Sequence, residues 1–139
     1  MSGLDPVSLG LPHREPFIFI DSVIELTLGE SACCRKVFGK DESFFRGHFP
    51  GNPVVPGVIL TEALAQTAGI AAGQPGKSFL LSAIKGMKFL AAVQPEEEII
   101  LRARKLAAVG ALWQFEVTAQ VGGVTVADGV VVLSEAARG

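Results

Sequence analysis

The fold is decided by the stretch GVILTEALAQTAGIAA, residues 57–72, with Pro56 before it and Gly73 after it. Leu60, Ala63, Leu64 and Ala68 follow a helical spacing, and small or apolar residues lie on nearly every other side as well. The glycines and the proline of residues 73–76 predict the end of this helix. A helix that is apolar all round is expected inside the molecule.

Strands are predicted on both sides of the helix. The clearest is Leu112 to Val121, where Trp113, Phe115 and Val117 alternate with polar residues. Gly122-Gly123 is a typical two-residue hairpin turn that leads into a further strand. The complete set of predicted strands is Phe17 to Leu26, Ser31 to Phe38, Phe79 to Val93, Glu98 to Val109, Leu112 to Val121 and Val124 to Leu133.

This order predicts an α+β fold over residues 1–139 as one domain, with an antiparallel sheet wrapped around one buried helix. One helix cannot cover both faces of a broad sheet. The strand from Val124 to Leu133 is mostly apolar on both sides, which favours burial against another subunit. We therefore expect an oligomer.

Composition excludes several function classes. The net charge is −2, so no basic field is present that would attract nucleic acid or an anionic membrane. The residues from Met1 to Pro6 do not resemble a secretory signal, and the adjacent Cys33 and Cys34 make a poor disulfide. We expect a reduced, cytoplasmic protein without a metal or another cofactor, because no zinc, dinucleotide or phosphate-loop pattern occurs.

Two side chains suggest chemistry. His48 lies in a loop stiffened by prolines and flanked by aromatic residues, and from composition alone a catalytic histidine and a structural one are about equally supported. Glu62 is the only formal charge between Arg46 and Lys77 and lies in the middle of the apolar helix. An unpaired carboxylate there is costly. Burial would raise its pKa and suit a general acid or a water-activating group, whereas a basic partner elsewhere or a locally exposed helix face would give it a structural role.

The beginning of the helix supplies a third feature. Free N–H groups at a helix N-terminus suit an oxygen that gains negative charge, and Gly57 would let a substrate approach the backbone. Alternatively, Gly57 only relieves crowding. Gln66 lies one turn beyond Glu62, so the pair could equally be a polar stripe that meets a partner subunit. For His13 a structural role at the first strand is favoured.

The run from Phe44 to Gln66, FFRGHFPGNPVVPGVILTEALAQ, resembles the signature of bacterial (3R)-hydroxyacyl-[acyl-carrier-protein] dehydratases of the FabZ type, which have the hot-dog fold. The segment from Leu11 to Asp21 resembles the N-terminal part of the same family. The resemblance implies that His48 and Glu62 are the catalytic pair, contributed by different subunits, and that the Gly57 amide polarises the thioester carbonyl. Phe49, Val58 and Gln66 are expected to contact the substrate with Gly57.

The resemblance also implies dimers, often three of them in a hexamer, and an acidic acyl carrier protein that presents the substrate. Departures from the family pattern occur at Glu15, Ser22 and Leu90 and in the turn Pro95-Glu96-Glu97, where the family has Pro-Gly-Asp. They leave open the chain-length preference and a role in a specialised lipid or polyketide pathway. Glutamate at position 62 favours dehydration without isomerisation.

The leading hypothesis is dehydration of a 3-hydroxyacyl thioester to the trans-2-enoyl product. The alternatives are a hot-dog thioesterase, in which Glu62 activates water, and a non-catalytic subunit that binds acyl carriers. The basic residues available for docking a carrier are Arg102, Arg104, Lys105, Lys85 and Lys88, and ordinary solvated strand faces explain them equally well.

Overall fold

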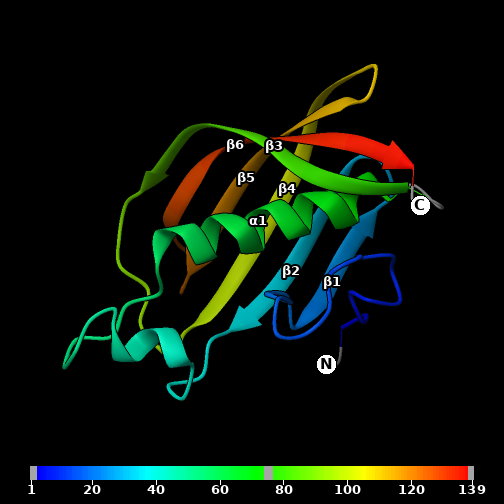
Figure 1. The fold of residues 1–139 in the computed structure, drawn as a ribbon. Helices are drawn as coiled ribbons and strands as arrows, with labels where there is room; N and C mark the ends of the chain where they lie inside the picture. The colour runs from blue at the N-terminus through cyan, green and yellow to red at the C-terminus, as the bar shows by residue number, and fades with distance from the viewer. Residues whose placement is uncertain (1–2, 74–76, 138–139) are drawn as a thin grey trace.

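One long helix lies across a curved sheet in the computed structural model, which describes residues 3–73 and 77–137 (Figure 1). The six strands are antiparallel and lie in the order β1-β2-β4-β5-β6-β3. Their bounds are β1 Ser22–Thr27, β2 Ser31–Val37, β3 Lys77–Phe89, β4 Glu98–Val109, β5 Leu112–Val121 and β6 Val124–Ala137; the helix α1 spans Gly57–Ala72 and a 3-10 turn, η1, spans Ser43–Arg46. The predicted α+β arrangement, a sheet around one buried helix, is confirmed.

The tight hairpin between β5 and β6 is formed as predicted. Val121 pairs with Val124, and the two residues between them, Gly122 and Gly123, have φ angles of 57° and 80°. Both angles lie in the left-handed region, where residues with a Cβ are disfavoured. The pair of glycines therefore sets the register of β5 and β6 at this end of the sheet.

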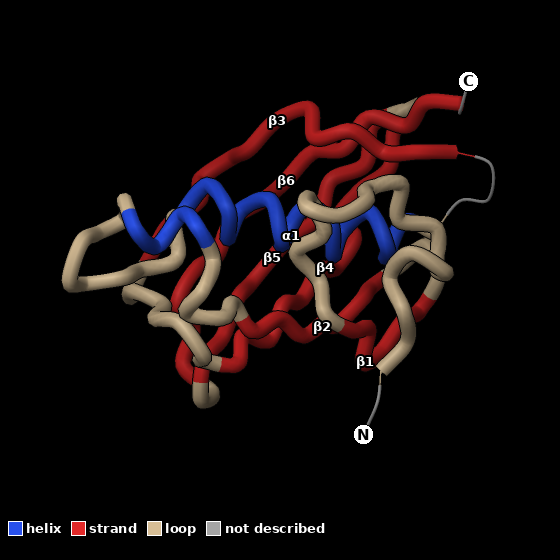
Figure 2. Tube along the Cα trace, turned by 60° about the horizontal axis from the view of Figure 1, so that its bottom comes forward, coloured by secondary structure: helices blue, strands red, loops and turns tan. Residues whose placement is uncertain are grey.

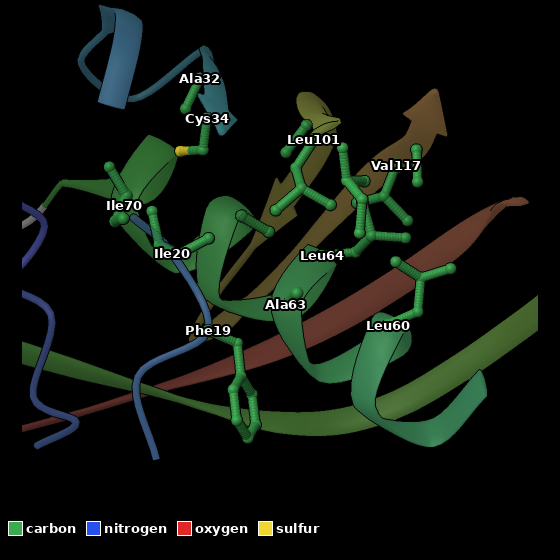
Figure 3. Packing of buried hydrophobic residues seen from close by; sticks show 14 of the residues in the cluster. Phe19, Ile20, Ala32, Cys34, Leu60, Ala63, Leu64, Ile70, Leu101 and Val117 are labelled. Carbon is green, nitrogen blue, oxygen red and sulfur yellow. The ribbon is translucent and has the colours of Figure 1, made fainter. Parts of the chain in front are cut away.

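Helix α1 fills the concave side of the sheet and packs mainly on β4 and β2 (Figures 1 and 2). Ala63 and Leu64 are fully buried, and Figure 3 shows them beside Leu101 of β4 and Val117 of β5. Small alanines on the helix allow this close approach to the strands. The helix ends at Gly73, whose φ of 50° is left-handed; the predicted contributions of Pro75 and Gly76 lie outside the described residues.

The first predicted strand is shorter in the structure. We predicted Phe17 to Leu26, whereas β1 begins at Ser22. The backbone at Phe17 and Phe19 is bonded to the Gln66 side chain of α1 and not to a neighbouring strand. These residues lie in a loop that covers one side of the helix (Figure 2).

We predicted the third strand from Phe79 to Val93, whereas β3 ends at Phe89, four residues earlier. The Val93 carbonyl accepts a hydrogen bond of 2.8 Å from Val55 N–H, and Val93 is buried. The chain thus leaves the sheet to pack below the loop that precedes α1. This places Phe89 next to the first residue of the helix.

Strand β3 forms one edge of the sheet, and most of its side chains are exposed. The exposed set includes the large apolar residues Leu80, Leu81, Ile84 and Phe89. The opposite edge, β1, is partly covered by Leu4, which forms a bridge with Val23. Within the described ranges, none of the helical structure is both long and apolar enough to cross a membrane.

Candidate active site

One ring nitrogen of His48 is hydrogen-bonded, and the other has no partner among the described residues. Its backbone N–H donates to the Phe44 carbonyl at 3.0 Å, and its Nδ1 lies 3.0 Å from the Val54 carbonyl oxygen. A carbonyl oxygen only accepts, so Nδ1 must carry the hydrogen and donate it. The other nitrogen, Nε2, is then unprotonated in the neutral ring, which is the form that a general base requires.

His48 and Gly57 line the same hollow, of about 320 Å³. Gly57 is the first residue of α1, and the preceding Pro56 caps the helix without a side-chain hydrogen bond. The N–H groups of Ile59 and Leu60 donate to the Pro56 carbonyl at 3.0 Å, whereas those of Gly57 and Val58 have no hydrogen-bond partner among the described residues. A Cβ at Gly57 would lie 3.0 to 3.2 Å from ring carbons of Phe89, so a larger residue here would require the half-exposed Phe89 ring to shift.

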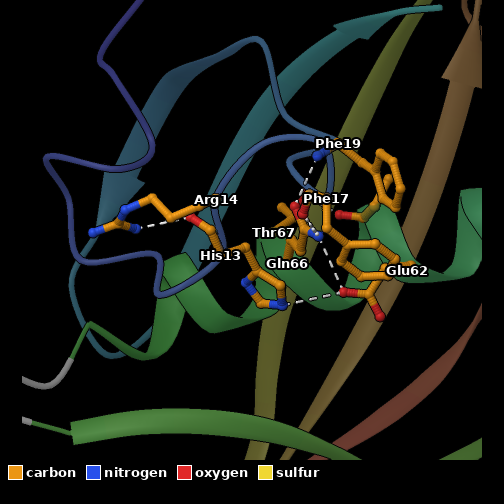
Figure 4. A network of polar contacts seen from close by, with 8 residues as sticks. His13, Arg14, Phe17, Phe19, Glu62, Gln66 and Thr67 are labelled. Atoms are coloured by element: carbon orange, nitrogen blue, oxygen red, sulfur yellow. Dashed lines mark hydrogen bonds and ion pairs between the residues drawn. The ribbon is translucent and has the colours of Figure 1, made fainter.

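Glu62 lies on another side of α1, in a contact network with two other side chains (Figure 4). Gln66 Nε2 donates to Glu62 Oε2 at 3.1 Å, and His13 Nε2 lies 3.5 Å from the same oxygen. Gln66 is only 1% exposed. Its amide also accepts from Phe19 N–H at 2.9 Å and donates to the Phe17 carbonyl at 3.1 Å. Gln66 therefore fixes both the N-terminal loop and the carboxylate.

The network opens into a cavity of about 590 Å³. His13, Glu62 and Gln66 form a polar part of the lining, and leucines from the N-terminal loop and from β3 form much of the rest: Leu9, Leu11, Leu80 and Leu81. Desolvation by burial lowers the pKa of His13, and the charge of Glu62 opposes this shift. Burial therefore favours the uncharged imidazole beside the carboxylate.

The structure separates the predicted residues into two groups. His48 and Gly57 share the smaller hollow, whereas Glu62 and Gln66 line the larger cavity; neither space contains both members of the expected catalytic pair. Phe49 and Val58 line neither space and are 51% and 77% exposed. A site that used all six residues would have to include surface that is open in one chain.

The sequence alone favours a structural role for His13 at the first strand, and the structure adds a contact between its Nε2 and Glu62 Oε2. It precedes Glu62 by 49 residues, so no local spacing connects them. The one available signal was the N-terminal resemblance from Leu11 onward.

The comparisons with known proteins agree with this architecture. Residues 26–130 match the ApeI-like family, described as ApeI dehydratase. The chain is 41% identical over 123 residues to the 3-hydroxyacyl-[acyl-carrier-protein] dehydratase FabZ of Ruminiclostridium cellulolyticum, covering 86% of this chain and 87% of that protein. It is 37% identical over 132 residues to the FabZ of Thiobacillus denitrificans, covering 90% and 91%.

Among solved structures, the dehydratase heterocomplex ApeI:P from Xenorhabdus doucetiae is similar with a TM-score of 0.80. The similarity covers 96% of this chain and 93% of that chain, at 17% sequence identity. Such low identity shows the shared fold, and the identities with the FabZ proteins show the relationship. The chain therefore belongs to the hot-dog dehydratases, in the family of the FabZ-type 3-hydroxyacyl-[acyl-carrier-protein] dehydratases.

Proposed function

We propose that this protein removes water from a (3R)-hydroxyacyl thioester and releases the trans-2-enoyl thioester. Nε2 of His48 takes the C2 proton, Glu62 donates a proton to the departing C3 hydroxyl, and the Gly57 N–H stabilises the negative charge that develops on the thioester oxygen. The observation that carries the proposal is the bond from His48 Nδ1 to the Val54 carbonyl, because it leaves Nε2 free to act as the base.

Two copies of the chain would complete the site. His48 and Glu62 line different spaces in one chain, so we propose that His48 of one copy faces Glu62 of the other. The exposed edge of β3 supports this assembly, since it combines unpaired backbone groups with Leu81, Ile84 and Phe89. A homodimer is the smallest assembly that fits, and a hexamer of three dimers stays a prediction.

An acyl carrier protein is the proposed donor of the substrate. Two of the five predicted docking residues are already paired: Arg104 with Glu116 at 2.9 Å and Lys105 with Glu30 at 3.3 Å. Lys85 and Lys88 are exposed on the strand that ends at Phe89, beside the hollow of His48. We therefore propose that an acidic carrier docks at Lys85 and Lys88.

The two free thiols, Cys33 and Cys34, support the predicted cytoplasmic location.

The reaction is tested with a 3-hydroxyacyl thioester and the His48→Ala variant. The wild-type protein should produce the absorbance of a conjugated enoyl thioester, and His48→Ala should lose about 100-fold or more in turnover, the usual cost of losing a general base. Circular dichroism checks that the variant is folded. Release of free thiol without enoyl product would identify a thioesterase, and binding of the acylated carrier with neither signal would identify a non-catalytic subunit.

Mixing variants tests whether the site is shared. His48→Ala and Glu62→Ala are each expected to be inactive, but a hybrid dimer retains one intact site of two. Random exchange makes half of the dimers hybrid, so activity should return to about one quarter of the wild-type value. Absence of recovery after exchange has been verified by native mass spectrometry would place both residues in a site within one chain.

A further inference from the structure

His13 is held against Glu62 by the N-terminal loop. Its ring lies over Phe17, with 6.0 Å between centroids and 22° between planes. The loop is braced by Arg14, whose Nη1 donates to the carbonyls of Leu11 and His13 at 2.9 and 2.8 Å. The imidazole thus has a defined place, with Nε2 directed at the carboxylate as Figure 4 shows.

The surroundings of the ring determine which nitrogen carries the hydrogen. Nδ1 of His13 is buried and has no hydrogen-bond partner among the residues that the structure describes. A hydrogen on Nδ1 would be a buried donor without an acceptor, which costs more than a normal hydrogen bond contributes. The hydrogen therefore belongs on Nε2, where it points toward Glu62 Oε2.

Two N–H groups consequently face the same oxygen of Glu62: Gln66 Nε2 at 3.1 Å and His13 Nε2 at 3.5 Å. An oxygen that faces two donors is a poor place for the proton of a carboxylic acid, so a protonated Glu62 carries it on Oε1. In Figure 4 this second oxygen points away from both His13 and Gln66. The contact from His13 is long, as is common for catalytic contacts without bound substrate.

We propose that His13 is a positioning residue for the catalytic acid: together with Gln66 it holds Oε2 of Glu62 and leaves Oε1 as the oxygen that donates the proton to the substrate. This inference rests on the proposed dehydratase function and assigns a role that the sequence did not suggest. The burial of His13 agrees with the role, because burial lowers its pKa and favours the uncharged imidazole. An uncharged imidazole can donate a hydrogen bond to Glu62, whereas an imidazolium cation would keep Glu62 ionised.

The test measures kcat and KM for His13→Ala and His13→Gln with a 3-hydroxyacyl thioester. His13→Ala should lower kcat about tenfold with little change in KM, the rate equivalent of one ordinary hydrogen bond lost in the transition state. The Gln side chain offers an N–H at a similar reach, so His13→Gln should recover most of the loss. If His13→Ala does not fold, His13→Leu replaces it, since Leu retains apolar packing on Phe17 but has no donor.

A double-mutant cycle separates positioning from a general structural role. In a Glu62→Gln background, His13→Ala should change the residual kcat by less than about twofold, because the group that it positions is gone. An equal loss in both backgrounds, or a kcat within about twofold of wild type for His13→Ala alone, would overturn the inference. Lack of enoyl product from the wild-type protein would instead refute the proposed function.

Discussion

Replacing Gln66 by Leu should destabilise the protein through hydrogen bonds and not through packing. The two side chains have similar volumes, so the substitution leaves little cavity in the site, which is 1% exposed. Three contacts are lost: those with Phe19 N–H, with the Phe17 carbonyl and with Glu62. The loop that covers α1 then loses its attachment to the helix.

The size of the effect follows from the burial of these groups. Phe19 N–H is in a buried bond, and a buried donor without a partner costs about 1–3 kcal/mol. The bond to the Phe17 carbonyl is only partly buried, so water can replace the partner and the loss is nearer the net value of about 0.5–1.5 kcal/mol. The free energy of unfolding should therefore fall by about 1.5–4.5 kcal/mol, as the sum of these two ranges.

Urea unfolding, followed by Trp113 fluorescence at one fixed protein concentration, measures the change. The matched control is Gln120→Leu, because Gln120 is half-buried on β5 and makes no side-chain hydrogen bond among the described residues. The control should stay within about 0.5 kcal/mol of wild type. A loss below about 1 kcal/mol for Gln66→Leu, or the same loss in both variants, would refute the idea that Gln66 anchors the loop.

Three further predictions concern the helix start, a buried thiol and the carrier. Gly57→Ala should leave the thermal stability nearly unchanged but lower turnover about 10- to 100-fold, because its Cβ displaces the Phe89 ring, which lines the hollow of His48. Thermal unfolding curves measure the stability, and an assay for the enoyl product measures the turnover. Burial raises the pKa of Cys34 from 9.0 to about 12, so the protonated thiol is favoured in the folded state. The free energy of unfolding should thus fall as pH rises from 9.0 towards 12, and it should fall less steeply in Cys34→Ala. Urea unfolding at several pH values measures this dependence, and equal slopes against pH in the two proteins would contradict the prediction. Turnover of a carrier-bound substrate should decrease with salt, and less so for a Lys85→Ala/Lys88→Ala variant, whereas a short thiol-bound analogue should respond little in either protein.

The sequence predicted those elements of the fold whose signals are local. The apolar run of 57–72 and the glycine pair at 122–123 each impose one conformation, and both elements have the expected bounds. The segment from Phe17 has equally strong strand propensity but lies in a loop. Its hydrogen-bond partner is a side chain 47 residues away, and propensity contains no information on such a partner.

The candidate site shows the same limit. His48 and Gly57 lie nine residues apart, and the loop between them brings them to one hollow. Glu62 was recognised because a charge inside an apolar helix is conspicuous. The pairing of Glu62 with His13 depends on how the N-terminal loop crosses α1, which only the three-dimensional structure reveals.

The open edge of β3 affects how readily a newly synthesised chain aggregates. While this edge is open, its unpaired backbone groups can pair with extended segments of other chains, which exposes the protein to aggregation. Anything that binds the folded chain at this edge would reduce that exposure by mass action. Strand β3 also has features that oppose edge-to-edge pairing. Lys85 and Lys88 flank an irregularity in its pairing with β6, at Gly86, and charges and bulges both discourage indiscriminate edge-to-edge growth. Removing them should shift the balance from ordered assembly toward insoluble material.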